Sequence, residues 1–436
     1  MKKNKRAKVY GFGLLAVIYD LLFIGSFLIY LPVCFLRKKI TIFSLLRKIG
    51  FFLPSCNKSI WIHAVSLGEV SLIEPIVNKM SENLKYSIVI STTTLTGNRV
   101  AYKKYGAVAK IIYFPLDISA VIKKFLRKIN PKIFITAEGE LWPNLISHIR
   151  RKKIPFLIIN GRISERAFRR YRLIRPVMKK MLSGCSRIGV QNEQYRKRFI
   201  DLGAEPERVS VTGSLKFNSI NPDEEKIQQF KQKYTVILKP NSRKLFIAAS
   251  THKPEEENIL DFYKDLHSKK RPTLLIAPRH PERVTSIEKI ALAKGFKPVR
   301  ISEVNNFEDK KNNLFILDTV GQLSYFYNIC DICFVGGSLS GSGGHNILEP
   351  LYFSKPVLFG PSMENFSDIA KKVIDNSAGI QVNSFQELKE KVKILLENEK
   401  ERNKYSQAAK IVFEKADSLS QNLKMISKEF SFFDES

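Results

Sequence analysis

Cysteine is scarce in this sequence, which has only five cysteines in 436 residues. They are odd in number, scattered, and mostly placed within apolar runs, at Cys34, Cys56, Cys185, Cys330 and Cys333. That distribution argues against a disulfide framework and favours a reducing compartment. Cys330 and Cys333 form a CxxC inside a predicted buried strand, without a second cysteine pair or a nearby histidine. We therefore expect no zinc site there and no metal cofactor.

Acidic residues are few relative to basic ones. Asp and Glu number 41 against 72 Lys and Arg, which gives a formal net charge of +31. Such a surplus favours acidic partners, namely nucleic acid, an anionic membrane face or phosphorylated substrates, although a lysine-rich proteome would also contribute to it. No RNA- or DNA-binding motif is present, so we expect no nucleic-acid partner. The hydrophobic share of 44% and the aromatic share of 11% exclude a disordered chain.

Charge is nearly absent between Gly11 and Leu36. Asp20 is the only strongly ionised side chain in this segment, which is long enough to cross a bilayer core. The apolar region is too long for a signal peptide, and no small-residue cleavage site follows it.

Cations flank this apolar segment on both sides: Lys2, Lys3, Lys5, Arg6 and Lys8 precede it, and Arg37, Lys38 and Lys39 follow it. A true span would leave the five cations that precede the segment on the unfavourable side of the membrane. We therefore expect residues 1–40 to form an anchor that lies in, or dips into, the cytoplasmic leaflet, with its cations near lipid phosphates. An ordinary single span is the alternative.

The rest of the chain exceeds what one hydrophobic core usually holds, so two domains are expected. It alternates helical patterns with short apolar runs, which indicates βαβ units and parallel sheets. The candidate strands are SIWIHAV, YSIVIS, AKIIYF, KIFITA, PFLIIN and RIGV, then KLFIAAS, TLLIAP, NLFILD, ICFVGGS and PVLFG. This pattern predicts an α/β fold of two Rossmann-like domains with a cleft between them. The expected limits are 41–218 and 244–405, with a linker at 219–243 and helices at 406–436 that could cross back to the first domain.

A glycine-rich loop, GGSLSGSGGHNILEP, follows the predicted strand ICFV. A helix starting near His345 would present free backbone N–H groups and a positive dipole end to an anion, most naturally a nucleotide phosphate. His345 and Asn346 could donate to phosphate oxygens, and Glu349 could accept from ribose hydroxyls. A flexible Gly/Ser loop followed by a capped helix is the alternative.

A second candidate anion site is APRHPER, at the end of the predicted strand TLLIAP. Arg279 and Arg283 carry fixed charges and can bind phosphate or carboxylate through two hydrogen bonds each. Their position at a strand end weighs against plain solvated surface. Ser250 to His252 follow another strand end, where capping of the next helix is the alternative to ligand binding.

In the first half, SLGEV places Glu69 where a strand gives way to a helix. The helix dipole would keep this carboxylate ionised at neutral pH, as a general base requires, although a simple stabilising N-terminal charge is the alternative. Glu138 and Glu140 lie at another strand end, and the hydroxyl-rich loop STTTLTG can donate to phosphate. A run of arginines from Arg162 predicts a solvated basic face or a surface for acidic lipid headgroups.

Several motifs together resemble the Kdo transferases, the 3-deoxy-D-manno-octulosonic acid transferases of lipopolysaccharide assembly. In order along the chain they are WIHAVSLGEV, STTTLTG, AEGELWPN, NGRISER, VQNEQYRKRFIDLGA, VTGSLKF, AASTH, APRHPER and GGHNILEP followed by VLFGP. The departures are Pro254 and Gly161, where Gly and Ala are expected, and Leu95, where Pro is common. These departures change the backbone conformations open to the three loops, and none removes a charged group that is assigned a role.

The resemblance implies a GT-B fold with the acceptor on the N-terminal domain, CMP-Kdo on the C-terminal domain and chemistry in the cleft. It also implies inverting, metal-independent transfer without a cofactor onto a lipid A precursor (lipid IVA) at the cytoplasmic face of the inner membrane. The catalytic base of the family falls on Glu69. Candidate donor-binding residues are Arg279, Gly337, Ser338, Gly344, His345, Asn346 and Glu349. Candidates for acceptor binding or transition-state support are Ser66, Gly68, Thr93, Thr94, Glu138, Glu140 and Arg162.

Two other classes of function remain compatible with the sequence. One is a different GT-B enzyme that uses a UDP-sugar and a soluble acceptor, against which the N-terminal anchor and the basic run argue. The other is a basic membrane-surface or nucleic-acid-binding protein without catalysis. The absence of a DxD-like carboxylate cluster beside the glycine-rich loop agrees with a metal-free route.

Overall fold

A computed structural model describes residues 7–38, 40–82, 86–220, 222–266, 271–304, 313–414 and 417–430, with side chains from residue 17 onward. The chain divides into two compact units. Unit 1 comprises Met1–Ser219 and Asp417–Ser436, and unit 2 comprises Ile220–Ala416. The side chains of the expected N-terminal cations Lys2, Lys3, Lys5, Arg6 and Lys8, and that of Lys39, lie outside the described residues.

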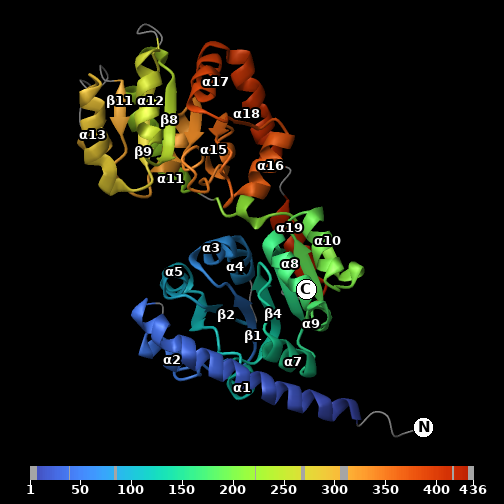
Figure 1. The fold of residues 1–436 in the computed structure, drawn as a ribbon. Helices are drawn as coiled ribbons and strands as arrows, with labels where there is room; N and C mark the ends of the chain where they lie inside the picture. The colour runs from blue at the N-terminus through green and yellow to red at the C-terminus, as the bar shows by residue number, and fades with distance from the viewer. Residues whose placement is uncertain are drawn as a thin grey trace. The chain divides into compact units, whose positions relative to one another are not determined.

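Unit 1 contains a parallel sheet of seven strands in the order β3-β2-β1-β4-β5-β6-β7 (Figure 1). The six apolar runs identified in the sequence form β1 to β6, and the short β7 was not expected. The strands are β1 (Ser59–His63), β2 (Ser87–Thr92), β3 (Ala109–Tyr113), β4 (Pro131–Ala137), β5 (Phe156–Gly161), β6 (Arg187–Val190) and β7 (Val209–Val211).

Unit 2 contains a second parallel sheet of seven strands in the order β10-β11-β9-β8-β12-β13-β14. The five predicted runs form β8, β9, β11, β12 and β13, whereas β10 and β14 were not expected. The strands are β8 (Leu245–Thr251), β9 (Thr273–Pro278), β10 (Val299–Arg300), β11 (Leu314–Ile316), β12 (Ile332–Val335), β13 (Val357–Phe359) and β14 (Gly379–Gln381).

Helices connect these strands in both units. Those of unit 1 are α1 (Ala7–Leu36), α2 (Ile42–Lys48), α3 (Leu67–Leu72), α4 (Glu74–Ser81), α5 (Leu95–Tyr105), α6 (Ser119–Ile129), α7 (Pro143–Arg151), α8 (Glu165–Leu173), α9 (Arg175–Leu182), α10 (Glu193–Asp201) and α19 (Ser418–Ser427). Those of unit 2 are α11 (Glu224–Leu238), α12 (Glu255–Lys264), α13 (Val284–Ala293), α14 (Leu323–Ile329), α15 (Leu348–Tyr352), α16 (Ser367–Asp375), α17 (Phe385–Glu397) and α18 (Glu399–Glu414).

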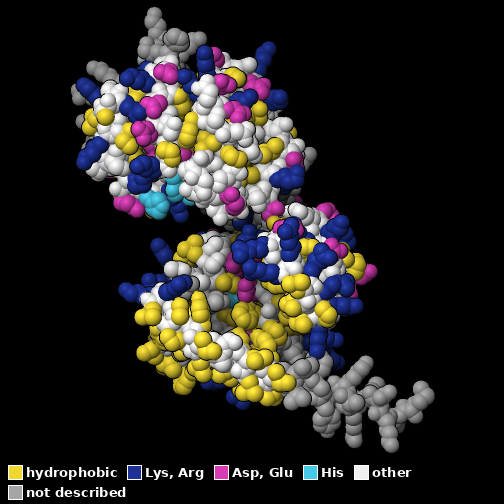
Figure 2. Space-filling model, in the orientation of Figure 1, with side chains coloured by type: hydrophobic (Ala, Val, Ile, Leu, Met, Phe, Trp, Pro, Cys, Tyr) yellow, Lys and Arg dark blue, Asp and Glu magenta, His cyan; other side chains and the backbone are white. Residues whose placement is uncertain are grey.

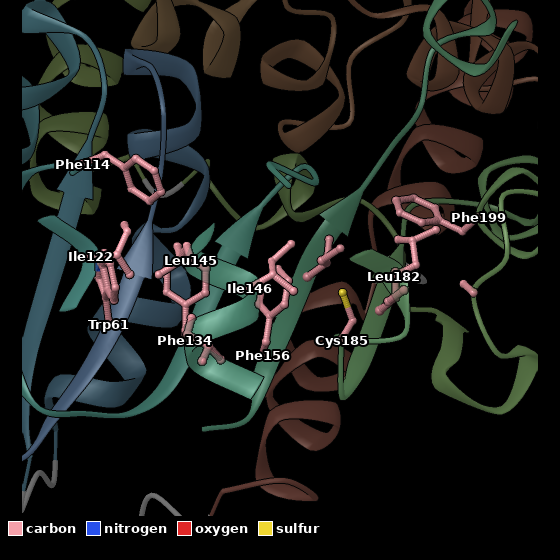
Figure 3. Close-up of a cluster of buried hydrophobic side chains, with 14 of the residues drawn as sticks. Trp61, Phe114, Ile122, Phe134, Leu145, Ile146, Phe156, Leu182, Cys185 and Phe199 are labelled. Carbon is pink, nitrogen blue, oxygen red and sulfur yellow. The ribbon is translucent and has the colours of Figure 1, made fainter. Parts of the chain in front are cut away.

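Both faces of the unit 1 sheet are buried, which is why its strands read as continuous apolar runs. On one face, the Trp61, Phe134 and Phe156 rings of β1, β4 and β5 follow one another with centroid distances of 4.7 and 5.3 Å (Figure 3). The Trp61 indole donates to the Ser91 hydroxyl at 2.8 Å, so its one polar atom is satisfied. Each such aromatic side chain stabilises the fold by about 2–3 kcal/mol through burial. The sheet is therefore a rigid base for the loops at its carboxyl edge.

The segment expected as a linker contains α11, which packs on α14 of unit 2. The Phe230 ring lies 4.8 Å from Tyr325, and the Tyr234 ring lies 4.9 Å from Phe326. Phe230 and Tyr234 are one helical turn apart, so they form an apolar strip in an otherwise charged segment.

The last described helix, α19, belongs to unit 1, whereas α18 belongs to unit 2. The Ser418 hydroxyl donates to the Ser214 carbonyl at 2.8 Å, and Arg187 pairs with Glu429 at 2.7 Å. These contacts hold α19 and Glu429 on β6 and the loop after β7.

Helix α1 lies along one side of unit 1 (Figure 1). Within the described part of the chain, Val17–Leu36 is the one helical segment long and apolar enough to cross a membrane, and 6% of its apolar window is buried. The Asp20 carboxylate accepts hydrogen bonds from the Ser119 backbone N–H at 3.2 Å and from the Asn144 side chain at 2.6 Å. The charged residue in the middle of the apolar run is thus bound by α6 and α7.

Candidate functional site

In unit 1, the predicted base Glu69 lies in the first turn of α3, just beyond β1. Ser66 is the N-cap residue, but its side chain makes no capping bond. Instead, the Glu69 carboxylate accepts from the Val65 N–H at 2.9 Å and from the Ser66 hydroxyl at 3.4 Å. The Glu69 carboxylate therefore accepts hydrogen bonds from the turn that carries it, and Ser66 lies within hydrogen-bonding distance of Glu69.

Burial raises the pKa of Glu69 to about 7. The negative charges of Glu138 and Glu140 raise it further, whereas the hydrogen bonds from Val65 and Ser66 lower it. This corrects the expectation that the helix N-terminus keeps Glu69 fully ionised at neutral pH. Helix α3 has six residues, so its dipole is short and burial dominates. A carboxylate with this pKa can accept a proton and release it again near pH 7.

The hydroxyl-rich loop after β2 lies against the Glu69 turn. The backbone N–H groups of Thr93 and Thr94 donate to the Val65 carbonyl at 3.1 and 3.2 Å. The Thr94 hydroxyl caps α5 by accepting from the Gly97 N–H at 3.0 Å, so it is committed to the fold rather than free for a ligand. Gly68 is exposed beside Glu69, and the nearest side chain to an added Cβ, apart from its chain neighbours, is that of Ser66 with its hydroxyl 3.9 Å away.

Glu138 and Glu140 follow β4. Glu138 has a φ of +61°, and its carboxylate pairs with the Arg162 guanidinium at 2.9 Å. Glu140 accepts from the Trp142 indole at 3.1 Å, and burial raises its pKa. A left-handed non-glycine residue costs about 1 kcal/mol or more and persists only where surrounding contacts fix it. Here the strained residue points a carboxylate at Arg162.

Two buried groups near this turn were not predicted as site residues. The His63 side chain is fully buried, its Nδ1 lies 3.0 Å from both oxygens of Ser91, and its ring stacks on Phe114 at 3.9 Å. Burial lowers the pKa of His63 to about 3, so its imidazole is neutral. The Lys48 ammonium donates to the Thr93 carbonyl at 3.0 Å. His63 stands inside the motif WIHAV, whereas no local pattern marks Lys48.

In unit 2, the glycine-rich loop that follows β12 surrounds a buried carboxylate. The Glu255 side chain, in the first turn of α12, is 0% exposed. Its two oxygens accept from the backbone N–H groups of His252, Gly337, Leu339 and Ser340 at 2.9, 2.9, 3.1 and 3.2 Å. From the sequence, the Glu run was expected only to cap the next helix. Its contact with the glycine-rich loop was not expected, because the partners are 82 to 85 positions apart and no local pattern links them.

Three predicted donor-binding residues, Gly337, Ser338 and Gly344, shape the loop itself. The Ser338 hydroxyl is buried, donates to the Val335 carbonyl at 2.6 Å and accepts from the Gly360 N–H at 2.8 Å. Gly337 has a φ of +69°, and an added Cβ would come within 2.9 Å of the His345 ring. Gly344 is also left-handed, with a φ of +66°. These residues give the loop its shape, and their side chains leave no free donor for a ligand.

His345 pairs with a second histidine. The Nε2 atoms of His252 and His345 lie 2.8 Å apart, and the two rings stack at 5.0 Å. The His280 ring is edge-on to His252 at 5.7 Å, and Figure 2 shows histidine side chains gathered at the surface of unit 2. Burial, followed by the charges of His252 and Arg279, lowers the pKa of His345 to about 4. A neutral His345 with a positive Arg279 nearby is suited to hydrogen bonding with an anionic ligand.

The helix expected to start near His345 starts later than predicted. Helix α15 begins at Leu348 and has five residues, so its dipole is short. The turn before it is closed by the Asn346 side chain, which accepts from the Leu348 N–H at 3.1 Å and donates to Glu349 at 3.0 Å. Burial raises the pKa of Glu349. Asn346 therefore orients Glu349, and both its side-chain oxygen and its side-chain amide group make hydrogen bonds within the protein.

The second predicted arginine of APRHPER is also committed to the fold. Arg283 binds both oxygens of Glu256 at 2.6 and 3.1 Å, and the Glu256 side chain is 2% exposed. This ion pair corrects the expectation that Arg283 is free for phosphate. Arg279 holds its loop through a backbone hydrogen bond to Thr251 at 3.1 Å and has an exposed side chain.

Within the described residues, no group of three His, Cys, Asp or Glu side chains could hold a metal ion. The five cysteines are free and buried.

Comparison with known proteins matches both units to glycosyltransferases. Residues 43–219 match the family model of 3-deoxy-D-manno-octulosonic-acid transferase (kdotransferase), and residues 244–412 match the model of group 1 glycosyl transferases. The chain is 35% identical over 362 residues to the 3-deoxy-D-manno-octulosonic acid transferase of Haemophilus influenzae, covering 82% of this chain and 84% of that protein. It is 39% identical over 344 residues to a bifunctional glycosyltransferase/methyltransferase of Fusobacterium nucleatum, covering 78% of this chain and 53% of that longer protein.

A solved glycosyltransferase structure from Rickettsia africae ESF-5 has a similar fold. It covers 86% of this chain and 99% of its own, with 15% sequence identity and a TM-score of 0.56. Together with the two seven-stranded parallel sheets, these matches establish the GT-B fold predicted from the sequence.

Proposed function

This chain belongs to the family of 3-deoxy-D-manno-octulosonic acid (Kdo) transferases, as its motifs predicted, and we propose that it transfers Kdo from CMP-Kdo to a lipid A precursor with Glu69 as general base. The proposal assigns the acceptor and the base to unit 1 and the donor to unit 2.

The proposed reaction is a single inverting displacement. The acceptor hydroxyl oxygen attacks the anomeric carbon of Kdo as the bond from that carbon to the CMP phosphate oxygen breaks. The phosphate keeps the bonding electron pair, and the hydroxyl proton passes to Glu69. The observation that carries this role is the Glu69 carboxylate at the carboxyl edge of β1, with its pKa raised to about 7. General-base catalysis of this kind contributes about 10²–10⁴-fold in rate.

On unit 2, the groups assigned to the donor are the exposed side chain of Arg279 and the imidazole of His345. Arg279 supplies a fixed positive charge for the phosphate, which gains negative charge as CMP leaves. Glu349 has one oxygen bound by Asn346 and is assigned to the ribose hydroxyls through the other. This assignment needs no metal ion, because the positive charge comes from the arginine.

On unit 1, the groups assigned to the acceptor are Arg162 and the arginines of α8. Helix α8 has no buried residue, and Arg166, Arg170 and Arg172 are all exposed on it. Arg162 is held by Glu138. Arginine binds phosphate through two parallel hydrogen bonds, so this surface fits the phosphates of a lipid A precursor.

We also assign the α1 side of unit 1 to the membrane surface. Apolar side chains gather there in Figure 2, and the exposed ones include Leu21, Leu22, Leu28, Ile29 and Leu36 of α1, Ile42 and Phe43 of α2, and Phe51 and Phe52. The hydrogen bonds from Ser119 and Asn144 to Asp20 hold α1 against the body of unit 1. A helix held in this way would lie in the interface rather than cross the bilayer. The cytoplasmic face of the inner membrane is the proposed location.

The test is incubation of the purified protein with CMP-Kdo and a tetraacylated lipid A precursor, followed by mass spectrometry of the lipid. We expect the lipid to gain the mass of one or more Kdo residues. The Glu69→Gln variant should retain CMP binding and lose transfer by about 10²–10⁴-fold. Transfer from UDP-sugars instead of CMP-Kdo, or near-normal turnover by Glu69→Gln, would overturn the donor or the base assignment, respectively.

A further inference from the structure

The glycine-rich loop of unit 2 already contains an anion, namely the carboxylate of Glu255. The backbone N–H groups of Gly337, Leu339 and Ser340 all point to this carboxylate, at 2.9 to 3.2 Å. Successive N–H groups that converge in this way form the kind of concavity that binds phosphate in other proteins. In this protein the concavity is filled from inside, because the Glu255 side chain is 0% exposed.

Close packing shows that the loop is built around this carboxylate. Gly336 has no room for a side chain, since an added Cβ would lie 2.5 Å from Glu255 Oε2 and 2.8 Å from Thr251 Cα. A carboxylate with two oxygens and four N–H donors is close to its full hydrogen-bonding capacity. The loop backbone and Glu255 therefore fix each other.

The same carboxylate also fixes the histidine pair. Glu255 Oε2 accepts from the His252 N–H at 2.9 Å, and His252 Nε2 lies 2.8 Å from His345 Nε2. His345 stands at the far end of the loop, and an added Cβ at Gly337 would touch its ring. One buried side chain on α12 thus holds both the start of the loop and, through His252, the imidazole at its end.

We propose that Glu255 is a positioning residue for the donor nucleotide: its carboxylate permanently occupies the N–H concavity of the glycine-rich loop and holds His345 in place. It follows that the donor phosphate binds to the side chains of His345 and Arg279 and not to the N–H groups of Gly337, Leu339 and Ser340. This inference rests on the proposed function for the identity of the nucleotide.

The test uses a variant that empties the concavity and a small anion that refills it. Glu255→Ala removes the carboxylate, and formate carries the same carboxylate group. We expect the affinity for CMP, measured by isothermal titration calorimetry, to fall about tenfold or more in Glu255→Ala, because hydrogen bonds to a charged group are lost. Sodium formate should restore most of this affinity, and an equal concentration of sodium chloride should not.

Glu256→Ala is the matched control. Glu256 is the next residue in the same helical turn and is equally buried, but its carboxylate binds Arg283 rather than the loop. Glu255→Gln is a second variant, in which the amide fills the space and should prevent rescue. Wild-type CMP affinity in Glu255→Ala, or equal formate rescue in Glu255→Ala and Glu256→Ala, would overturn the proposal. If Glu255→Ala does not fold without formate, recovery of its folded state on addition of formate supports the proposal, and failure to recover with either formate or chloride contradicts it.

A second measurement separates this inference from the proposed function. Formate should raise the thermal unfolding midpoint of Glu255→Ala and leave that of the wild type unchanged, whatever nucleotide the protein uses. If formate has this effect but the wild type does not bind CMP, the donor assignment fails while the internal anion stands. If CMP binds to the wild type and formate has no effect on Glu255→Ala, the internal anion fails alone.

Discussion

The Nε2 atoms of His252 and His345 lie 2.8 Å apart, so one ring nitrogen donates a hydrogen bond and the other accepts it. This contact requires at least one neutral imidazole, because two imidazolium groups have no acceptor to offer each other. It joins the loop after β8 to the loop before α15 and makes the geometry of unit 2 sensitive to acid.

The stability of unit 2 should therefore depend on these histidines. Burial lowers the pKa of His252 and lowers that of His345 to about 4, so between the ordinary histidine pKa and pH 4 the unfolded chain binds more protons than the folded one. The stability they contribute is present above the ordinary pKa and is lost as the pH falls toward 4. Thermal unfolding from pH 8 to pH 4 should show a smaller pH dependence for His345→Gln. Thr285→Ala, at an exposed position of α13 without a titratable side chain, should retain the wild-type slope.

The rate of transfer should fall as Glu69 becomes protonated. With a pKa of about 7 for Glu69, kcat should decrease about tenfold per pH unit below pH 7 and level off above it. Glu140→Gln removes a neighbouring negative charge but leaves an amide oxygen that can accept from Trp142. It should shift the rising limb of the pH profile to lower pH. Glu74→Gln is the control, because Glu74 is the half-buried first residue of α4 and its carboxylate pairs with Lys104 rather than facing Glu69. An unshifted profile in Glu140→Gln would contradict this account of the Glu69 pKa.

The two arginines of APRHPER should differ in role: Arg283 stabilises the fold and Arg279 binds the ligand. Arg283→Gln leaves the buried Glu256 carboxylate without its partner and should lower the free energy of unfolding by about 3 kcal/mol. Arg279→Gln should change the free energy of unfolding by about 0.5 kcal/mol or less and weaken CMP binding. Urea unfolding and calorimetric titration of CMP measure the two effects. The reverse assignment, with Arg279→Gln the less stable variant, would contradict the geometry.

Membrane binding should depend on the exposed face of α1. Leu22 and Ile29 are 66% and 81% exposed, and the double variant Leu22→Glu, Ile29→Glu should reduce sedimentation with vesicles that contain phosphatidylglycerol about tenfold or more, because it removes apolar area and adds negative charge. The double variant Leu292→Glu, Val320→Glu is the matched control, since Leu292 and Val320 are 58% and 83% exposed on unit 2. Equal loss of vesicle binding in both proteins would show that net charge, and not the α1 face, determines binding.

Much of the fold could be predicted from local pattern. Eleven of the fourteen strands, β1 to β6 with β8, β9, β11, β12 and β13, correspond to apolar runs in the sequence. The three that were missed have two or three residues each and include polar ones, as in Val299–Arg300 and Gly379–Gln381. Strands of that length exist because a neighbouring strand completes their hydrogen bonds, and no local pattern encodes that pairing.

The candidate site was predictable in its location but not in its electrostatics. Parallel strands end at one edge of a sheet, so motifs such as SLGEV and TAEGE could be expected to lie close together. The raised pKa of Glu69 could not be predicted, because it depends on how much solvent the folded chain excludes and on the charges of two carboxylates at another strand end. Likewise, the ion pair of Arg283 and the hydrogen bonds of Glu255 could not be predicted, because their partners are distant along the chain.

The sequence by itself determined the family, the two sheets, the apolar N-terminal helix and the residues available for chemistry, because these follow from periodicity, composition and contiguous motifs. Only the tertiary structure decided which of those side chains are free to bind a ligand and which form hydrogen bonds or ion pairs within the protein. The physical reason is that hydrogen-bond partners and desolvation come from groups distant along the chain, as when a carboxylate at 255 meets the backbone of residues 337 to 340.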